Sequence, residues 1–228
     1  MFHLLRVVMP DRPGALGDVA TALAVAGGDI VGVEVVEHRA DGFAVDDFTL
    51  DLPPGRAADG LVSACMALPG VEVEFVGPYA AGGNLQRDLE AIEAMTEHPR
   101  RADVVLVDLV PGVFPGSWGL LLEQRRDCTV TVVAATPGAP LAEGFSPPWL
   151  PLQRATRVFA DPSWAPPSWD DVIAAIAPLN TATRVVVAGR NGGPQTLDSE
   201  VMRLAHLAAL AGTVRRVGHI DGSPPPAV

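Results

Sequence analysis

The sequence predicts an α+β protein with two domains, each built around an antiparallel β-sheet. The first 79 residues follow the order strand, helix, strand, strand, helix, strand. A Gly-rich linker at residues 80–83 separates them from a second domain at 84–213, and residues 214–228 are expected to form a tail. With 228 residues, of which 48% are hydrophobic, the chain is long enough for two packed cores.

The first strand is predicted at residues 3–9, where apolar side chains dominate. Pro13-Gly14 then forms a tight turn, and a helix follows up to the pair Gly27-Gly28, which ends it. Helical spacing places one set of apolar residues on a face that we expect to be buried: Leu16, Val19, Ala20, Leu23 and Ala26.

The rest of the first domain alternates in the same manner. Residues 30–38 form a β-branched strand, and the hairpin turn at 40–42 leads into the next strand. In that strand the apolar residues change parity, which predicts a bulge at Asp46-Asp47. A helix with Leu61, Cys65 and Leu68 on one face precedes a fourth strand at 71–75. This order is that of the ferredoxin-like fold, with two helices on one face of the sheet.

The second domain is expected to open with a helix and to close with another. The first helix has Leu85, Leu89, Ile92 and Met95 on one face, and the last starts at Thr196 with Leu197, Val201, Leu204 and Ala208 facing the core. A short helix is predicted from Trp169 to Ile176, and a long loop at 136–156. The strands are expected at 103–109, 118–123, 129–135, 157–160 and 184–189.

Composition excludes several functions. The net charge of −11 argues against nucleic acid or an anionic membrane as a partner. The absence of lysine excludes a Schiff base and a Walker-type phosphate loop. The chain has two cysteines far apart, so we expect no disulfide, and it shows neither a leader nor a long apolar run, so we expect a cytoplasmic protein. The five histidines have no metal-ligand spacing, so we expect no metal, and no cofactor is expected either.

The most informative motif is the turn from Asp11 to Leu16. A helix start leaves backbone N–H groups unpaired, and the positive end of the helix dipole lies beside them. Such a site suits a carboxylate or another small anion. The alternative is purely structural: Asp11 caps the helix and Pro13-Gly14 shapes the turn.

With this motif, the order of elements and Gly28-Asp29-Ile30, residues 1–79 resemble an ACT domain. ACT domains are small modules that bind amino acids and regulate metabolic enzymes. The resemblance implies a homodimer in which the turn of one subunit and the start of the second strand of its neighbour form the site. Many members have Asn where this chain has Asp29. An ionised Asp only accepts hydrogen bonds, so Asp29 suits a ligand ammonium. The implied ligand-binding residues are Asp11, Arg12, Gly14, Ala15, Leu16, Asp29 and Ile30.

The second domain resembles a GAF domain. The matching residues are the strand Arg184–Arg190, the helix that follows Pro194-Gln195-Thr196, and Phe159-Ala160-Asp161 as an earlier strand. The cyclic-nucleotide signature of that family is absent and requires a lysine. The resemblance therefore implies a fold and a pocket without a cyclic-nucleotide site. With both domains, the chain resembles stand-alone, amino-acid-binding ACT proteins of high-GC, actinobacterial-type bacteria.

Three functions follow from these patterns. The first is a non-enzymatic sensor of an amino acid, with no catalytic residue; the second is a module that dimerises and binds a client protein. The third is an enzyme that uses a pocket in the second domain, with acids drawn from Asp103, Asp108, Asp161, Asp170 and Asp171.

Two further clusters leave alternatives open. The acids Asp46, Asp47 and Asp51 form either a solvated strand face or an acid/base pair. The aromatic residues of the second domain form either a core with its lids or the lining of an apolar cavity: Trp118, Trp149, Trp164, Trp169, Phe114, Phe145 and Phe159.

Overall fold

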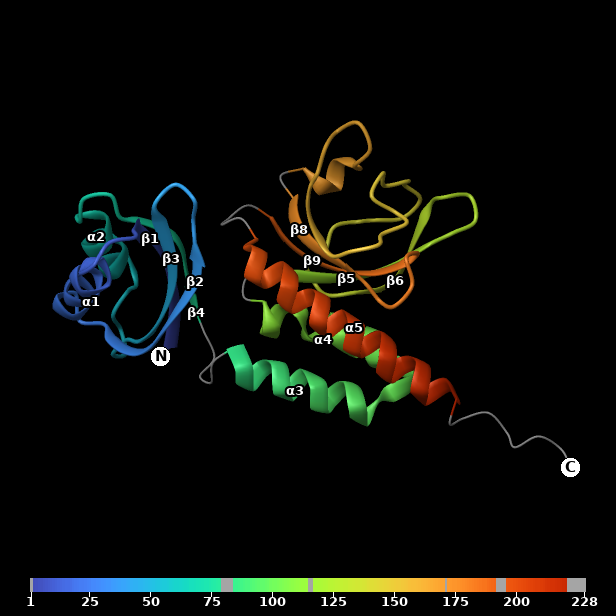
Figure 1. The fold of residues 1–228 in the computed structure, drawn as a ribbon, viewed down its shortest axis with the longest axis horizontal. Helices are drawn as coiled ribbons and strands as arrows, with labels where there is room; N and C mark the ends of the chain where they lie inside the picture. The colour runs from blue at the N-terminus through green and yellow to red at the C-terminus, as the bar shows by residue number, and fades with distance from the viewer. Residues whose placement is uncertain (1, 79–83, 115–116, 171, 192–195, 221–228) are drawn as a thin grey trace, which may run out of the picture. The chain divides into compact units, whose positions relative to one another are not determined.

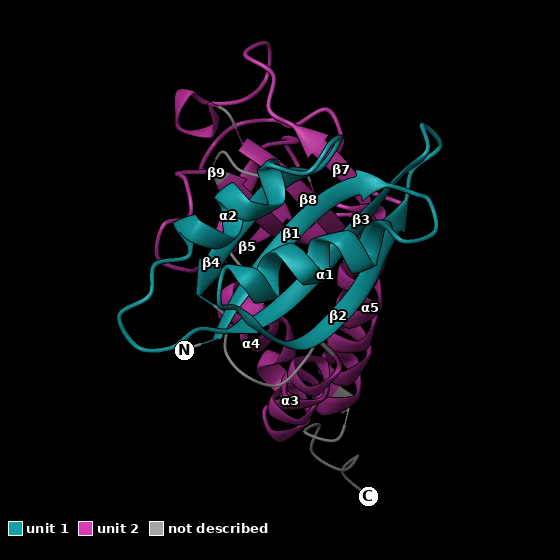
Figure 2. Ribbon diagram, turned by 90° about the vertical axis from the view of Figure 1, so that its left-hand side faces the viewer, with its two compact units in different colours: residues 1–83 teal, residues 84–228 magenta. Residues whose placement is uncertain are grey.

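The structure is a computed structural model that describes residues 2–78, 84–114, 117–170, 172–191 and 196–220. The chain divides into two compact units, Met1–Gly83 and Asn84–Val228, which are shown in Figure 1 and coloured separately in Figure 2. The expected linker at 80–83 lies outside the described residues.

Unit 1 has the predicted βαββαβ order. Its sheet has the strand order β2-β3-β1-β4, and every neighbouring pair is antiparallel. Both helices cover the same face of this sheet (Figure 2). The elements are β1 (Phe2–Pro10), α1 (Ala15–Val25), β2 (Asp29–His38), β3 (Phe43–Asp51), α2 (Asp59–Met66) and β4 (Glu72–Pro78).

The core of unit 1 lies between the sheet and its two helices. Val7 and Met9 of β1 pack against Val19 and Leu23 of α1 in one buried cluster. Cys65 of α2 belongs to the same cluster, and its burial raises the pKa of the thiol to about 11, so the side chain stays protonated and unreactive.

The face of α1 that enters this core differs by one position from the prediction. Ala15 is buried, whereas Leu16 is 41% exposed. The helix starts at Ala15, which turns the buried stripe toward Ala15, Val19 and Leu23 and leaves Leu16 at its edge.

The predicted bulge at Asp46-Asp47 was wrong. Pairing between β1 and β3 is continuous from Phe2↔Asp51 to Pro10↔Phe43, and the irregularities lie instead in β2, between Ile30 and Gly32 and between Val35 and Glu37. The parity change has another cause, because β3 is central and both of its faces are buried: Val45 and Phe48, on opposite faces, are both fully inaccessible.

Unit 2 contains a five-stranded sheet with the order β6-β5-β9-β8-β7, and its neighbouring pairs are all antiparallel. The helices lie on one face and the long loops on the other (Figure 1). The elements are α3 (Asn84–Glu97), η1 (Pro99–Arg101), α4 (Ala102–Val113), β5 (Trp118–Gln124), β6 (Val130–Ala135), β7 (Thr156–Phe159), η2 (Pro167–Trp169), β8 (Val172–Pro178), β9 (Arg184–Asn191) and α5 (Asp198–Ile220).

Three predicted elements of unit 2 were wrong. The strand expected at 103–109 is part of helix α4, and the helix expected from Trp169 to Ile176 is mostly strand β8. Each segment contains a short apolar run, at 104–107 and at 172–177, in which periodicity does not separate a buried helix from a buried strand. The expected tail at 214–228 also begins too early, because α5 continues to Ile220; residues 221–228 lie outside the described residues.

Two hydrophobic clusters lie on the opposite faces of this sheet. The helical side holds Met95, Leu106 and Phe114, while the loop side holds Trp118 and Trp169 with the partly buried Phe145, Trp149 and Trp164. Most of the aromatic residues are thus core and lid, as one of the two alternatives proposed. Phe159 differs from them because it is exposed. Leu85 and Leu89 of α3 are exposed as well, although the prediction puts them on the same helix face as the buried Met95.

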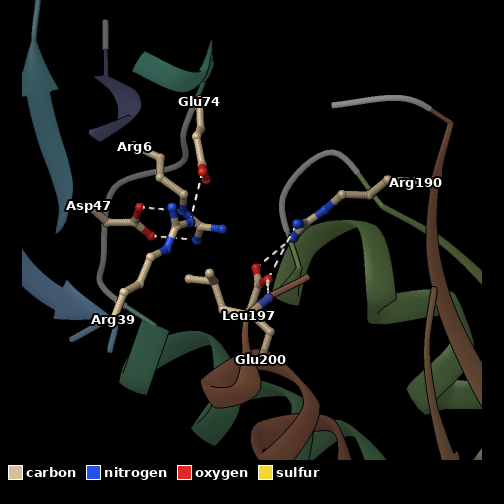
Figure 3. A network of polar contacts seen from close by, with 7 residues as sticks. All are labelled: Arg6, Arg39, Asp47, Glu74, Arg190, Leu197 and Glu200. Atoms are coloured by element: carbon tan, nitrogen blue, oxygen red, sulfur yellow. Dashed lines mark hydrogen bonds and ion pairs between the residues drawn. The ribbon is translucent and has the colours of Figure 1, made fainter. Parts of the chain in front are cut away.

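The final helix is anchored by an ion pair. Arg190 of β9 donates to both carboxylate oxygens of Glu200, at 2.6 and 3.3 Å, and Glu200 also accepts the backbone N–H of Leu197 at 2.8 Å (Figure 3). Leu197, Val201, Leu204 and Ala208 are buried, which confirms the predicted inner face of this helix.

Candidate functional site

The turn between β1 and α1 is built by backbone hydrogen bonds. Asp11 donates its N–H to the carbonyl of Gly42 in the β2–β3 hairpin, at 2.9 Å, and Arg12 donates to Pro10 at 2.9 Å. Gly14 has φ of 91°, a left-handed conformation in which a side chain is strained. The turn is therefore fixed to the sheet before the helix begins.

Helix α1 begins without a side-chain cap. The amide of Ala15 donates to the carbonyl of Arg12 at 3.2 Å, and the first bond within the helix runs from Asp18 to Gly14. Within the described part of the chain, the N–H groups of Gly14, Leu16 and Gly17 have no hydrogen-bond partner. These donors and the positive end of the helix dipole suit a carboxylate or another small anion.

Arg12 adds a positive charge beside this turn. Its guanidinium donates to the carboxylate of Asp18 at 3.1 Å and to the carbonyl of Pro13 at 3.4 Å, and both partner contacts are exposed. A Cβ on Gly14 would lie 3.9 Å from the guanidinium nitrogen Nη1. An exposed ion pair is weak, so the Arg12 side chain can turn to a bound carboxylate at little cost.

Asp11 does not cap the helix. Its Oδ2 lies 2.9 Å from Nδ1 of His38, at the end of β2, and both side chains are about half exposed. His38 was not singled out in the sequence, since a lone histidine at the end of a strand carries no signal of its own. The pairing of β2 with β3 brings it to the turn.

A buried carboxylate lies on the same side of the sheet. Asp46 is 3% exposed, and its Oδ1 has no hydrogen-bond partner. Burial, with the charges of Asp47 and Asp11, raises the pKa of Asp46, while His38 opposes this shift. The expectation of a solvated acidic face on β3 was therefore wrong for Asp46.

The neighbouring acid, Asp47, faces the other way and is paired. It accepts two hydrogen bonds from Arg6 at 2.7 and 2.8 Å, and a second pair joins Arg39 to Glu74 at 2.8 Å (Figure 3). The hydrogen bond to Glu74 raises the pKa of Arg39. Asp47 is also buried, so it forms neither a solvated face nor an acid/base pair with Asp46.

Asp29 and Ile30 lie at the far end of the sheet from this turn. Asp29 starts β2 opposite Asp51, while His38, which contacts the turn, ends the same strand. At about 3.3 Å per residue the strand separates them by roughly 30 Å. One chain thus brings Asp11, Arg12, Gly14, Ala15 and Leu16 together, but not Asp29 and Ile30 with them.

The acids considered for an enzyme are scattered. Asp103 is buried in ion pairs with Arg184 and Arg215, at 2.7 and 3.1 Å. Asp161 and Asp170 line a cavity of about 370 Å³ beside Trp169, and Asp171 lies outside the described residues. Within the ranges that the structure describes, no three His, Cys, Asp or Glu residues are grouped to hold a metal, and no helix is long and apolar enough to span a membrane.

Comparison with known proteins identifies the region that holds the turn. The ACT domain family model matches residues 3–58. The match covers β1, α1, β2 and β3 and includes the turn, the unpaired amides, His38 and Asp46. Unit 1 is accordingly an ACT-like unit, in agreement with the resemblance of the sequence. No curated protein matches the chain.

Solved structures give weaker likenesses. The GAF domain from Acinetobacter phosphoenolpyruvate-protein phosphotransferase is 12% identical, with 63% of this chain and 100% of that one covered and a TM-score of 0.45. The chromophore-binding domain of a bacteriophytochrome from R. palustris is 10% identical, with 96% and 94% covered and a TM-score of 0.42. A formyltetrahydrofolate deformylase from Pseudomonas putida KT2440 is 13% identical, with 42% and 38% covered and a TM-score of 0.29, so the chain spans less than half of its length.

Proposed function

We propose that the chain is a non-enzymatic regulatory protein that binds an amino acid at the first turn of its ACT-like unit. The observation that carries this proposal is the set of unpaired amides at Gly14, Leu16 and Gly17 beside the guanidinium of Arg12. Backbone donors fixed by the fold bind a carboxylate without reorganisation. The family match over residues 3–58 supports a regulatory role that depends on a small ligand.

A second copy of the chain completes the site in this proposal. Asp29 and Ile30, implied by the resemblance, lie roughly 30 Å along β2 from the turn of their own chain. In a homodimer the start of β2 from one subunit can lie over the turn of the other. The edge position of β2 and its exposed Val31, Val33 and Val35 favour this strand as a contact between subunits.

Regulation follows from differential affinity. A ligand held between two subunits favours the dimer arrangement in which both parts of the site meet, and it shifts the equilibrium by the difference in its affinity for the two arrangements. Unit 2 would pass this shift to a client protein. We place the protein in the cytoplasm and, from its sequence, among regulatory ACT-like proteins of high-GC bacteria.

Calorimetry with the full chain and each of the twenty L-amino acids tests the proposal. We expect at least one to bind with a Kd below about 1 mM, which corresponds to about −4 kcal/mol. At a hundred times its Kd such a ligand adds about 2.7 kcal/mol to the free energy of unfolding, which a thermal shift detects. If no amino acid binds more tightly than 1 mM, the chain is better explained as a dimerisation and interaction module.

A further inference from the structure

Asp46 lies on the face of the sheet that α1 covers. In the pairing of β1 with β3 it stands opposite Val7, and residues opposite each other in an antiparallel pair project to the same face. Val7 packs in the cluster that contains Ala15 and Val19 of α1. Asp46 is thus on the same side as the first turns of that helix.

The position along the strand brings Asp46 close to the start of the helix. β1 ends at Pro10, opposite Phe43, and Asp46 is three residues further along β3. His38, which bonds Asp11 in the turn, stands opposite Ala44 and so shares this face with Asp46. The charged groups that act on Asp46 are His38 of β2, Asp11 of the turn and Asp47 of its own strand.

The carboxylate of Asp46 lacks a compensating contact. Its Oδ1 is buried without a hydrogen-bond partner, whereas the carboxylate of Asp47 is bonded at both oxygens by Arg6. A buried acceptor without a partner lowers the stability of the fold. Buried polar groups in folded proteins are nearly always hydrogen-bonded, so the open Oδ1 of Asp46 is an acceptor that a group from outside the chain can satisfy.

We propose that Asp46 accepts the ammonium group of a zwitterionic ligand whose carboxylate binds the amides of Leu16 and Gly17. The inference rests on the proposed function and deepens it, because it states which charge the ligand must carry besides its carboxylate. A free carboxylic acid satisfies the helix start alone, whereas an amino acid satisfies both the donors of α1 and the acceptor on β3.

The other acids of the proposed site fit this role less well. Asp11 already bonds His38, and Asp29 is exposed, so water competes for it. An ammonium gains more from a carboxylate that is shielded from water, because the local dielectric constant is lower. The buried acid therefore discriminates between charged and uncharged ligands more strongly than the exposed ones.

The experiment uses the full chain as wild type, as Asp46→Asn, and as the matched control Asp59→Asn, which changes an exposed acid at the start of α2. Calorimetry first finds the L-amino acid that binds best. Two analogues are then titrated: its carboxylic acid with hydrogen in place of the ammonium, and its amine without the carboxylate. We expect wild type to bind the amino acid about tenfold or more tightly than the carboxylic acid, since a charge-assisted hydrogen bond is lost.

The variants locate the acceptor. Asp46→Asn should weaken binding of the amino acid by about tenfold and leave the carboxylic acid within about twofold, whereas Asp59→Asn should change neither by more than about twofold. Equal binding of the amino acid by wild type and Asp46→Asn overturns the inference, and the proposed function survives. Far-UV circular dichroism checks that each variant is folded.

Two further outcomes separate this inference from the proposed function, and both use wild type alone. If the carboxylic acid binds as tightly as the amino acid, the site recognises only an anion and the role of Asp46 is wrong. If neither the amino acid, the carboxylic acid nor the amine binds, the proposed function falls together with the inference.

Discussion

Arg6 and Asp47 form a two-pronged ion pair across neighbouring strands, with Nε donating to Oδ1 at 2.7 Å and Nη2 to Oδ2 at 2.8 Å. Both side chains are about 6% exposed. Asp46, the residue before Asp47 in β3, projects to the opposite face, where its Oδ1 has no partner. Of two adjacent carboxylates, one is thus hydrogen-bonded at both oxygens and the other keeps an open acceptor.

We predict that Asp47→Ala lowers the free energy of unfolding of unit 1 by about 3 kcal/mol, because it leaves the Arg6 guanidinium buried without its counter-charge. The double variant with Arg6→Met and Asp47→Leu should recover most of that loss, since neither charge of this pair remains. Urea unfolding followed by far-UV circular dichroism measures both. Equal losses in the single and double variants would show that the pair itself, rather than an isolated charge, determines the result.

The four tryptophans provide an internal control for this measurement. Trp118, Trp149, Trp164 and Trp169 all belong to unit 2. Their fluorescence therefore follows the unfolding of unit 2, while circular dichroism follows both units. A substitution in β3 should change the unfolding followed by circular dichroism and leave the unfolding followed by tryptophan fluorescence unchanged.

Asp46→Asn should raise stability at neutral pH by about 1 kcal/mol. Burial raises the pKa of Asp46 in the folded state above its ordinary value of 3.8, so the folded protein binds this proton more tightly than the unfolded chain does. Stability from this group is then present below pH 3.8 and is lost as the pH rises through the folded pKa. The advantage of the Asn variant should be largest at pH 7 and vanish near pH 3.5, as urea unfolding at both values would show. A constant advantage contradicts the assignment.

Gly14→Ala should lower stability by about 1 kcal/mol, because the residue has φ of 91° and a Cβ is strained there. Gly17→Ala is the matched control. Gly17 lies inside α1 with open space around the position of a Cβ, so alanine should raise stability by about 0.5–1 kcal/mol. Thermal unfolding of the two variants side by side measures the difference, and effects of the same sign would refute the turn geometry.

Gly189→Ala should destabilise unit 2 by about 2 kcal/mol. A Cβ at Gly189 would lie 2.3 Å from the ring of Trp118, which stands opposite it in the pairing of β5 with β9. Gly112→Ala in α4 meets no atom within 4 Å and serves as the control. The tryptophan fluorescence of Gly189→Ala should shift as well, because Trp118 must move. An unchanged fluorescence midpoint would show that the ring yields without cost.

Local patterns predicted unit 1 well because each of its elements has a clear signal. The apolar run in β1, the Pro13-Gly14 turn and the Gly27-Gly28 stop are separate indications of the same order. In unit 2 the apolar runs at 102–113 and 172–178 carried no usable period, so helix α4 and strand β8 were exchanged. Long-range pairing decides such segments, and local propensity does not.

The site was predicted in part. The sequence indicated the turn and the helix start, since these are local. His38 and Asp46 reach the turn through pairing in the sheet, which a single sequence does not display. One signal was present: Asp46 has the parity of Phe48 and Leu50, so a continuous strand places it on the apolar side. The assumption of a bulge concealed that reading.

Helix α1 starts without a capping side chain, although the chain places Asp11 and Asp18 nearby. The N–H groups of its first turn consequently lack the acceptor that a capping side chain would supply. A bound carboxylate would act as the missing N-cap, so that a metabolite supplies to this helix what Ser, Thr or Asp supplies to most others. The stability of the helix start would then depend on the concentration of that metabolite.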